Sequence, residues 1–318
     1  MNRTVLVTGG TGFLGKRLGR ALAACGHHVV LAGRNNKQNL LAAQMSGCDV
    51  LPLDVSHIES VRDVVARTHP SVIIHAAATK FVDLSETQPM EALDVNVLGS
   101  QNVARVAIDK GVDIVIGIST DKASPPVRNT YGLTKALMER LFCAMDGTSG
   151  TRFLCVRYGN VAWSTGSVLP IWRRMLKTTG VIQTTGPEML RFFFTVNEAV
   201  ELVLTALDRV DELHGTVLSR RMKSARMEDV LKVWTALEGA RYERIEGRPG
   251  DREEEFLIGE QELPYTREQV YDGIPHYVIT FNQKVGTPIP RPLTSRTAER
   301  LTDDEIRALV TDPPDEEL

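Results

Sequence analysis

The sequence predicts an α/β protein built on a doubly wound parallel sheet, with a smaller C-terminal subdomain. Short apolar runs alternate with amphipathic stretches from the first residues to about residue 157. The runs are apolar along their whole length, which is typical of strands buried on both faces of a parallel sheet. A glycine-rich turn, "TGGTGFLG", lies directly between the first run and the first amphipathic stretch. Alternation of this kind predicts helices on both faces of the sheet.

The expected elements can be placed in order along the chain. Six strands are expected in the first half, at Val5–Thr8, His28–Leu31, Val50–Leu53, Val72–His75, Ile114–Ser119 and Phe153–Arg157. Helices are expected between and after them, at Leu14–Cys25, Ser56–Arg67, Met90–Lys110, Tyr131–Ala144, Val168–Lys177, Asn197–Asp208 and Met227–Leu237. Short strands are expected between the last three helices.

Three regions are expected from this pattern. Residues 1–160 form the doubly wound domain, and residues 161–285 form a mixed subdomain interleaved with it. Residues 286–318 turn Pro-rich and then acidic, and Thr302 with Glu305 forms a capping box that predicts a short helix there. The final "DPPDEEL" is expected to be solvated or disordered.

Composition excludes several classes of protein. The formal net charge of -3 argues against a nucleic-acid partner, and no apolar run approaches the length of a membrane helix. The first strand begins almost at the N-terminus, so we expect no signal peptide. The four cysteines show no C-x-x-C spacing, so free thiols and no metal site are expected. We expect a soluble, cytoplasmic protein.

The glycine-rich turn is the first candidate functional segment. Gly9, Gly10, Gly12 and Gly15 follow the first expected strand and open the first expected helix. Glycines at this place let the backbone turn tightly and approach a pyrophosphate, whose charge the helix N-terminus stabilises. The context between a strand and a helix supports a dinucleotide-binding Rossmann motif.

The end of the second strand favours NADP over NAD. An NAD site places Asp or Glu about 20 residues after the glycines, whereas this chain has Arg34 and Lys37 and no carboxylate. Cations there suit a 2′-phosphate, although the same two residues would also fit a merely solvated loop. Asp54 is placed to meet the adenine, and the small residues of "HAAATK" admit the nicotinamide half. The candidate cofactor contacts are Gly9, Thr11, Gly12, Phe13, Leu14, Gly15, Arg34, Asn35, Lys37, Asp54, Val55, Ala76, Ala77, Ala78, Lys80, Asn96, Tyr131, Lys135 and Tyr158.

A redox pair follows the fifth strand. Tyr131 and Lys135 are spaced i, i+4 and therefore share one face of a helix. An ammonium beside the phenol and an oxidised nicotinamide above it favour the phenolate, which can take a proton from a sugar hydroxyl. Thr120, at the end of the fifth strand, can hydrogen-bond the same hydroxyl. An ordinary helix face is the alternative, but the position at the carboxyl end of a doubly wound sheet favours catalysis.

These residues resemble those of the extended short-chain dehydrogenase/reductases. Within that superfamily the chain closely resembles the inverting UDP-N-acetylglucosamine 4,6-dehydratases and their relatives in polysaccharide biosynthesis. The matching segments cover nearly the whole chain in one order: "TGGTGFLG", "HAAATKFV", "NVLGSQNV", "STDKA", "YGLTK", "VRYGNV", "GSVLP", "RFFFT", "EGRPGD" and "PHYVI".

The resemblance implies roles for Asp121 and Lys122. Oxidation of a hexose at C4 acidifies the C5 proton, so a base can remove it while an acid helps the C6 hydroxyl leave as water. Asp121 would be that acid and Lys122 that base, with the C5 proton returned on the opposite face. Lys122 can serve only if burial or neighbouring cations lower its pKa. The alternative for the pair is a surface ion couple.

The resemblance also implies a substrate site in residues 161–285. The nucleotide diphosphate and base would meet Asn160, the loop from Thr165 to Pro170 and two arginines, and Lys80 would lie near the sugar. The candidate substrate contacts are Lys80, Asn160, Ser167, Val168, Arg191, Arg248 and Asp251. The chain departs from the family here: Trp163 lies in a loop where a basic residue is usual, and Glu254 stands where a histidine is usual. These departures alter the pocket rather than the reaction.

The expected function is an NADP-dependent 4,6-dehydratase acting on UDP-N-acetylglucosamine or a close analogue. A nucleotide-sugar epimerase or reductase of the same superfamily is the enzymatic alternative, because it uses the same 4-keto intermediate. A non-catalytic NADP-binding regulator is the alternative from another class. A homo-oligomer, dimer or hexamer, is expected, with the helices over Met90–Lys110 and Tyr131–Ala144 as its contact.

Overall fold

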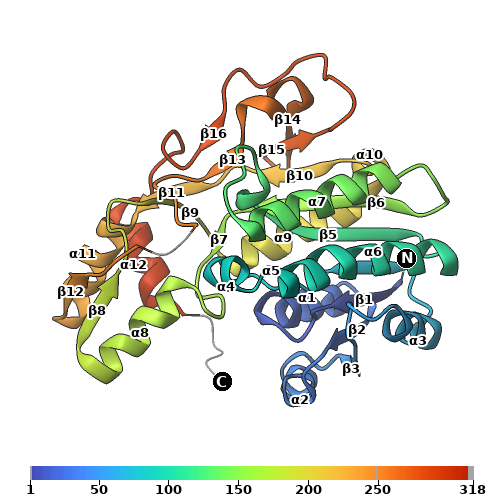
Figure 1. The fold of residues 1–318 in the computed structure, drawn as a ribbon, viewed down its shortest axis with the longest axis horizontal. Coiled ribbons are helices and arrows are strands. Elements are labelled where there is room, and N and C mark those ends of the chain that lie inside the picture. The colour runs from blue at the N-terminus through green and yellow to red at the C-terminus, as the bar shows by residue number, and fades with distance from the viewer. Residues whose placement is uncertain (1, 248–249, 314–318) are drawn as a thin grey trace.

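A nine-stranded sheet forms the centre of the molecule in the computed structural model, which describes residues 2–247 and 250–313 (Figure 1). The strand order is β14-β15-β10-β6-β5-β4-β1-β2-β3. From β3 to β10 neighbouring strands are parallel, while β15 and β14 close the edge antiparallel. The strands are β1 (Thr4–Thr8), β2 (His28–Gly33), β3 (Asp49–Pro52), β4 (Val72–His75), β5 (Ile114–Thr120), β6 (Arg152–Tyr158), β10 (Val217–Arg220), β14 (Thr266–Tyr271) and β15 (Ile274–Ile279).

The sheet confirms the predicted fold class and all six predicted strands. Each predicted strand overlaps an observed one. Strands β1, β4 and β5 are almost entirely buried, and a parallel strand buried on both faces is apolar along its length and is therefore easy to detect in the sequence. Strands β10, β14 and β15 come from residues 161–285 yet join the central sheet. Part of the second region therefore belongs to the same sheet as the first.

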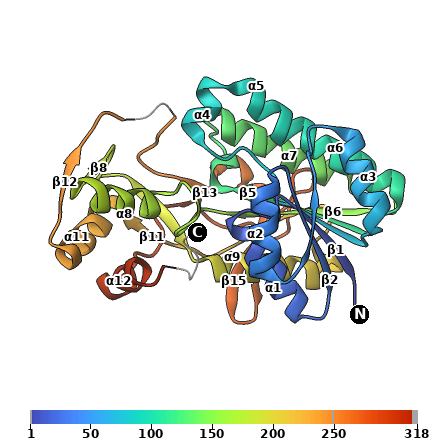
Figure 2. The same ribbon diagram turned by 90° about the horizontal axis from the view of Figure 1, so that it is seen from below.

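Helices cover both faces of the sheet (Figure 2). One layer contains α1 (Phe13–Ala24), α2 (Asn36–Ser46) and α9 (Val196–Asp208). The other contains α3 (Ile58–Thr68), α4 (Val82–Thr87), α5 (Pro89–Ala92), α6 (Gly99–Lys110) and α7 (Thr130–Met145). Helix α2 was not predicted: it buries only Asn39 and Ala42, so it lacks the apolar periodicity that reveals a helix.

The chain is helical over the whole predicted range Met90–Lys110, but not as a uniform α-helix. A π-helical segment, η1 (Leu93–Leu98), lies between α5 and α6. Its Asn96 side chain is fully buried and bonds the backbone of Thr79, accepting from its nitrogen at 2.8 Å and donating to its oxygen at 3.0 Å. Short π-helical segments are frequent at functional sites. Here the two hydrogen bonds of Asn96 hold the loop that follows β4.

A smaller unit packs against the carboxyl end of the sheet. It contains a three-stranded sheet of β11 (Lys223–Arg226), β9 (Leu190–Phe194) and β7 (Asn160–Val161). Two short ladders pair β12 (Arg241–Arg244) with β8 (Val181–Thr184), and β13 (Phe256–Ile258) with β16 (Leu293–Thr294). The remaining helical segments are η2 (Asp121–Ala123), α8 (Val168–Thr179), α10 (Val210–Leu213), α11 (Met227–Glu238), η3 (Glu260–Tyr265) and α12 (Asp303–Thr311).

A second apolar core holds this unit together. Three tryptophans, Trp163, Trp172 and Trp234, pack in it with Ile306 and Val310 of α12. The predicted capping box opens α12, since Thr302 and Glu305 bond each other's backbone nitrogens. The acidic tail expected to be disordered falls mostly on residues 314–318, which lie outside the described residues.

A buried ion network joins the unit to the sheet. The Arg157 guanidinium on β6 is fully buried and donates to both oxygens of Glu139 on α7, at 2.9 and 2.6 Å. It also donates to both oxygens of Glu262 on η3, at 2.9 and 2.8 Å. Ser124, just after η2, donates to the same Glu262 at 3.1 Å. One carboxylate therefore holds β6, η3 and the end of η2 in a fixed arrangement.

Replacing Glu262 should destabilise the protein strongly. In Glu262→Ala the Arg157 charge keeps one carboxylate partner and loses the other, and breaking a buried pair from one side costs about 3 kcal/mol. Equilibrium denaturation should show this loss in the free energy of unfolding. The matched control is Glu268→Gln on the exposed face of β14, where surface changes stay within about 0.5 kcal/mol. A loss below about 1 kcal/mol in Glu262→Ala would show that the network is dispensable.

Candidate active site

The candidate residues gather at the carboxyl ends of the parallel strands. Thr120 ends β5, Tyr158 ends β6, and Gly9 and Ala76 directly follow β1 and β4. Strands β1, β4, β5 and β6 are consecutive neighbours in the sheet, so their ends meet along one edge. Ligands bind at this edge in doubly wound folds.

Thr120, Asp121, Lys122 and Tyr131 form one contiguous cluster. The Thr120 hydroxyl donates to Asp121 Oδ1 at 3.0 Å and also hydrogen-bonds the Tyr131 phenol. The Lys122 ammonium donates to the same Asp121 oxygen at 3.0 Å. Asp121 is fully buried, and the Lys122 side chain is only 14% exposed. The arrangement is therefore a buried acid–base pair beside Tyr131, not a surface ion couple.

Lys122 is held as an ammonium in this state. Its Nζ lies 3.3 Å from Asn160 Oδ1 and 3.5 Å from Glu255 Oε1, in addition to Asp121. Burial works to lower the pKa of Lys122, but the charges of Asp121 and Glu255 outweigh burial and raise the pKa above its usual value. The condition set for Lys122 as a free base, a lowered pKa, is therefore not met in this arrangement. Asn160, which the resemblance places at the nucleotide, contacts the Lys122 amine.

Tyr131 is a protonated phenol here. Burial raises its pKa to about 12, with the Asp121 charge adding to this, while the Lys122 charge and the Thr120 hydrogen bond work in the opposite direction. Lys135, expected to supply the ammonium beside it, is buried with its Nζ 3.1 Å from Met138 Sδ. Burial lowers the pKa of Lys135 to about 8. The cation acting on the phenol in this structure is therefore Lys122.

The glycine-rich turn fits a dinucleotide. Gly9 has a φ of 66°, and a Cβ there would come within 2.6 Å of the Ala77 nitrogen. Helix α1 begins after Gly12, without a side-chain cap and without an acid in its first turn. Its first backbone N–H groups can therefore receive a pyrophosphate. Thr11, Phe13, Leu14 and Gly15 lie on the same turn.

Opposite charges meet at the expected adenine end. Arg34 and Lys37 are exposed where α2 begins, and Asn35 caps that helix by accepting from the Gln38 nitrogen at 3.1 Å. Burial works to raise the pKa of Asp54, but hydrogen bonds from Ser56 and the Arg34 charge hold it below its usual value.

The sequence did not reveal the carboxylate at this end. Glu91 on α5 lies 3.4 Å from an Arg34 nitrogen, 57 residues away in the chain. Val55, which follows Asp54 in the chain and is also expected near the cofactor, is buried.

The loop after β4 lines the nicotinamide side. Ala76, Ala77 and Ala78 are partly buried. Lys80, at the end of this loop, is exposed to solvent as a residue. Protein atoms nevertheless surround its amine, and this desolvation lowers the pKa of Lys80 to about 8. Tyr158 is buried and stacks on Phe194, with ring centroids 5.9 Å apart. Asn96 is the exception among the expected contacts, because its amide is occupied inside the protein by Thr79 and by the Thr134 hydroxyl.

The expected substrate residues lie on several segments of the smaller unit. Ser167 occupies the N-cap position of α8, which begins at Val168, but its side chain makes no capping hydrogen bond. Its buried hydroxyl has no hydrogen-bond partner among residues 2–247 and 250–313. Arg191 on β9 points its guanidinium toward Glu255, with Nε 3.9 Å from Oε1. Asp251 is exposed and accepts from the Thr185 hydroxyl at 3.3 Å. Arg248 lies outside the described residues.

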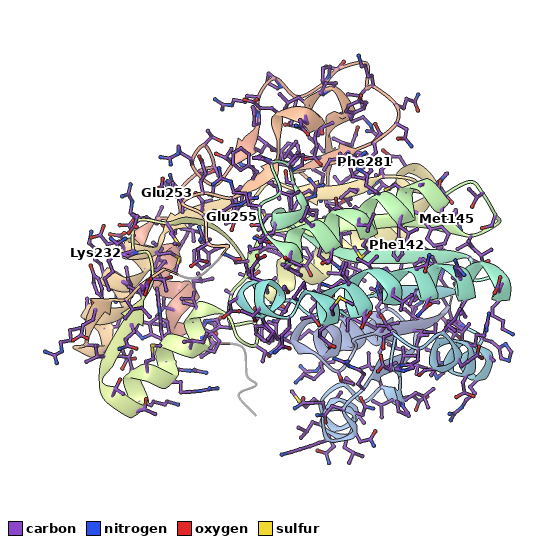
Figure 3. The ribbon with its side chains drawn as sticks, viewed as in Figure 1. Phe142, Met145, Lys232, Glu253, Glu255 and Phe281 are labelled. Atoms are coloured by element: carbon purple, nitrogen blue, oxygen red, sulfur yellow. The ribbon has the colours of Figure 1, made fainter. Side chains whose placement is uncertain are left out.

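Sequence reasoning gave no role to two further charged residues here. Glu255 is 3% exposed and lies against Lys122, while the neighbouring Glu253 is exposed (Figure 3). Arg252 is 5% exposed, with Nη1 3.9 Å from Glu255 Oε2. Asp121 Oδ2, Glu255 Oε2 and two Arg252 nitrogens have no hydrogen-bond partner in the part of the chain that the structure describes. Buried polar atoms require partners, so this cluster suits a polar, hydroxyl-bearing ligand.

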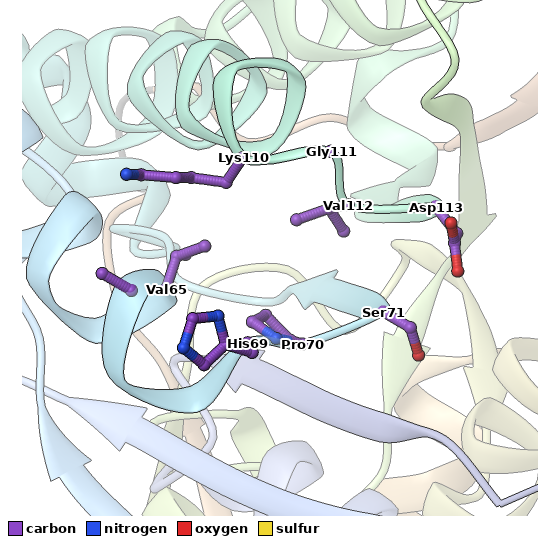
Figure 4. Close-up of a pocket in the computed structure, with 9 residues that line it drawn as sticks. Val65, His69, Pro70, Ser71, Lys110, Gly111, Val112 and Asp113 are labelled. Carbon is purple, nitrogen blue, oxygen red and sulfur yellow. The ribbon is translucent and has the colours of Figure 1, made fainter.

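A separate cavity lies at the opposite edge of the sheet. It has a volume of about 260 Å³ and is lined by His69, Ser71, Lys110 and Asp113 among others (Figure 4). Ser71 and Asp113 directly precede β4 and β5, so the cavity faces the amino ends of the strands. It is remote from Thr120 and the pair beside it.

The family follows from comparison with known proteins. Residues 5–274 match the model of the polysaccharide biosynthesis protein family. The chain belongs to this family. An uncharacterized membrane protein of Methanocaldococcus jannaschii is 36% identical over 289 residues, covering 85% of this chain and 84% of that one. In the described residues of this chain, no helix is long and apolar enough to cross a membrane.

Two further relatives carry functional names. Capsular polysaccharide biosynthesis protein CapD of Staphylococcus aureus is 33% identical over 297 residues, covering 88% of this chain but 49% of CapD. The chain thus spans about half the length of CapD. The UDP-glucose 4-epimerase of Rickettsia rickettsii is 30% identical over 331 residues, covering 98% of this chain and 96% of the epimerase.

Solved structures share the fold. Pen from Bacillus thuringiensis superposes with a TM-score of 0.89 at 27% identity, covering 98% of this chain and 97% of Pen. TunA, an NAD-dependent NDP-hexosamine 5,6-dehydratase of tunicamycin biosynthesis, superposes with a TM-score of 0.68 at 23% identity, covering 79% of this chain and 86% of TunA. The fold is that of the extended short-chain dehydrogenase/reductases.

Proposed function

We propose that this member of the polysaccharide biosynthesis protein family is an NADP-dependent nucleotide-sugar 4,6-dehydratase. Its substrate is UDP-N-acetylglucosamine or a close analogue, and the reaction inverts C5. The observation that carries the proposal is the buried Asp121–Lys122 pair, hydrogen-bonded through Thr120 to the redox tyrosine. Removal of a hydride requires only Tyr131, whereas loss of water requires an additional acid and base.

The cofactor would supply the redox chemistry: hydride would leave C4 for a bound oxidised nicotinamide and would return to C6. Tyr131, held by Thr120, would act as the phenolate. Its phenol first gives its own proton to solvent, which the charges of Lys122 and of an oxidised nicotinamide favour, and the phenolate then takes the proton of the C4 hydroxyl. The C4 ketone then acidifies C5. Lys122 takes the C5 proton, the electron pair delocalises into the carbonyl, and Asp121 protonates the C6 hydroxyl as it leaves. Protonation of C5 on the other face gives the inverted 4-keto-6-deoxy sugar.

One proton transfer prepares both catalytic groups. In the structure Lys122 is an ammonium and Asp121 its hydrogen-bonded carboxylate, with 3.0 Å between Nζ and Oδ1. Moving the shared proton to Asp121 breaks the N–H bond and forms an O–H bond. The products are a neutral amine that can act as the base and a carboxylic acid that can act as the acid. The pair therefore reaches its working state without exchanging a proton with solvent.

An epimerase is the second candidate, supported by the match to the Rickettsia rickettsii UDP-glucose 4-epimerase. The reaction of a 4-epimerase requires the tyrosine but would leave Asp121 and Lys122 without a function. In a cofactor-binding regulator Tyr131 would also have no function. The three functions therefore differ in the mass of the product: one water lost, none lost, or no product.

Mass spectrometry of the wild-type protein with NADP and a panel of UDP-, GDP- and ADP-sugars tests the proposal. We expect one sugar to lose one water, with deuterium from solvent at C5. Lys122→Ala should abolish solvent exchange at C5 while C4 oxidation survives, because only the base is removed. Product of unchanged mass would instead establish an epimerase. Exchange that persists in Lys122→Ala would contradict the role of Lys122.

The choice of NADP rests on Arg34 and Lys37, because both are exposed cations at the expected ribose end. TunA uses NAD, so the fold alone leaves the choice open. In Arg34→Ala the affinity for NADP should fall about tenfold, since a charged hydrogen bond to the 2′-phosphate is worth roughly 1.5 kcal/mol. Titration of the same variant with NAD, which lacks that phosphate, serves as the control. Equal losses for both cofactors would contradict the assignment.

We infer a homo-oligomer from the face of η1 and α7. Leu93, Leu98, Leu133 and Leu137 are 40–57% exposed on these two segments, and a shallow apolar groove of about 350 Å³ runs between them. A second copy brings the same groove and so can bury both. Leu137→Asp should therefore shift the mass measured by light scattering to that of a smaller species. Leu40→Asp on α2, equally apolar and 66% exposed, is the control.

A further inference from the structure

The Lys122 amine has an unusual set of acceptors. An ammonium carries three hydrogens, and three oxygens lie around Nζ: Asp121 Oδ1 at 3.0 Å, Asn160 Oδ1 at 3.3 Å and Glu255 Oε1 at 3.5 Å. Two of the three are carboxylates. The proposed reaction uses Asp121 as the acid but assigns nothing to Glu255, which is equally buried and comes from a segment more than 130 residues further along the chain.

Glu255 is itself fixed in place. Its backbone N–H donates a hydrogen bond to Ser295 Oγ at 2.9 Å, which holds the main chain at this position. Arg191 and Arg252 each approach one of its carboxylate oxygens to 3.9 Å, from β9 and from the preceding turn. The charged and titratable groups that act on Lys122 or its two carboxylates are therefore Asp121 on η2, Tyr131 on α7, Arg191 on β9, and Arg252 with Glu255 before β13.

We propose that Glu255 is a positioning residue that couples C5 deprotonation to loss of water by keeping the shared proton inside the Asp121–Lys122 pair. This inference rests on the proposed dehydratase function. Glu255 contacts Lys122 and not the reacting atoms, so it acts through the amine.

Coupling follows from the number of protons in the site. If Lys122 loses its proton to Asp121, the site holds one base and one acid, and C5 deprotonation can proceed to water loss. If Lys122 loses its proton to solvent, the site holds a base beside a carboxylate, so C5 can exchange its proton but the C6 hydroxyl has no acid. A second carboxylate beside the ammonium opposes loss to solvent, because an opposite charge within about 4–6 Å favours the charged form by 1–3 pKa units.

The test compares the rate of proton exchange at C5 with the rate of product formation in the Glu255→Gln variant. The amide keeps an oxygen near Nζ and removes the charge. The wild-type holoenzyme and the variant turn over the accepted sugar in deuterated solvent, and mass spectrometry follows deuterium in recovered substrate and in dehydrated product. We expect the ratio of deuterated recovered substrate to product to rise about tenfold in Glu255→Gln, corresponding to a shift of about one pKa unit.

The pH profile gives the second measurement, with its sign fixed by the same reasoning. Neutral amine accumulates as pH rises through the pKa of Lys122, and removing a carboxylate lowers that pKa. The rise of uncoupled exchange with pH should thus move to lower pH, by about one unit, in Glu255→Gln. Glu255→Asp, which keeps the charge, should retain the wild-type profile more closely. Glu253→Gln, an exposed carboxylate on the same segment, is the matched control.

Two outcomes overturn the inference. Exchange and product falling in the same proportion, with no movement of the pH profile, would show that Glu255 only supports the structure. An unchanged ratio in Glu255→Gln would show that the pair keeps its proton without Glu255. Failure of the proposed function looks different, because the wild-type protein itself would then release no water from any sugar of the panel.

Discussion

The proposed reaction depends on one buried ammonium, which must be charged at rest and neutral when it acts as the base. Lys122 sits among Asp121, Asn160 and Glu255, and two carboxylates raise its pKa although burial opposes this. A lone buried amine would deprotonate easily and would then lack an acid partner. The pair resolves this conflict, since a proton moved over 3.0 Å changes both groups at once while the total charge of the site stays the same.

That arrangement needs a rigid surrounding, because Asp121 and Lys122 lie on a single turn of 3₁₀ helix. The turn is fixed at its start by the end of β5 and at its end by Ser124, whose hydroxyl donates to Glu262. Both oxygens of Glu262 in turn accept hydrogen bonds from Arg157, the central cation of the network between β6, α7 and η3. Stability and geometry thus depend on one carboxylate, because the residue that neutralises the buried guanidinium also holds the turn that carries Asp121 and Lys122.

Much of this could be read from the sequence where the signal was local. The six strands and the glycine-rich turn depend on consecutive residues, and Thr120, Asp121, Lys122 and Tyr131 lie within twelve positions of one another. The partners that decide the protonation of Lys122 are not local. Glu255 reaches it from a segment in which Asp251 and Glu253 are exposed while Glu255 is buried, and no periodicity distinguishes one acid from another. The sequence could therefore state only that a free base needs a lowered Lys122 pKa, and it could not reveal the second carboxylate that raises this pKa.

The departure at Trp163 shows how a change at the pocket can be used for packing. Its ring lies 5.7 Å from Trp234, and its indole nitrogen donates to the Leu309 carbonyl at 2.7 Å, so it ties α12 to the loop that leads to Ser167. The Arg173 guanidinium of α8 lies 4.4 Å above the same ring. A side chain committed to the core in this way gives no charge to a ligand. The positive charge near this loop therefore comes from α8 rather than from the loop itself, which places the difference from the usual family pattern on the substrate side and leaves the acid–base pair untouched.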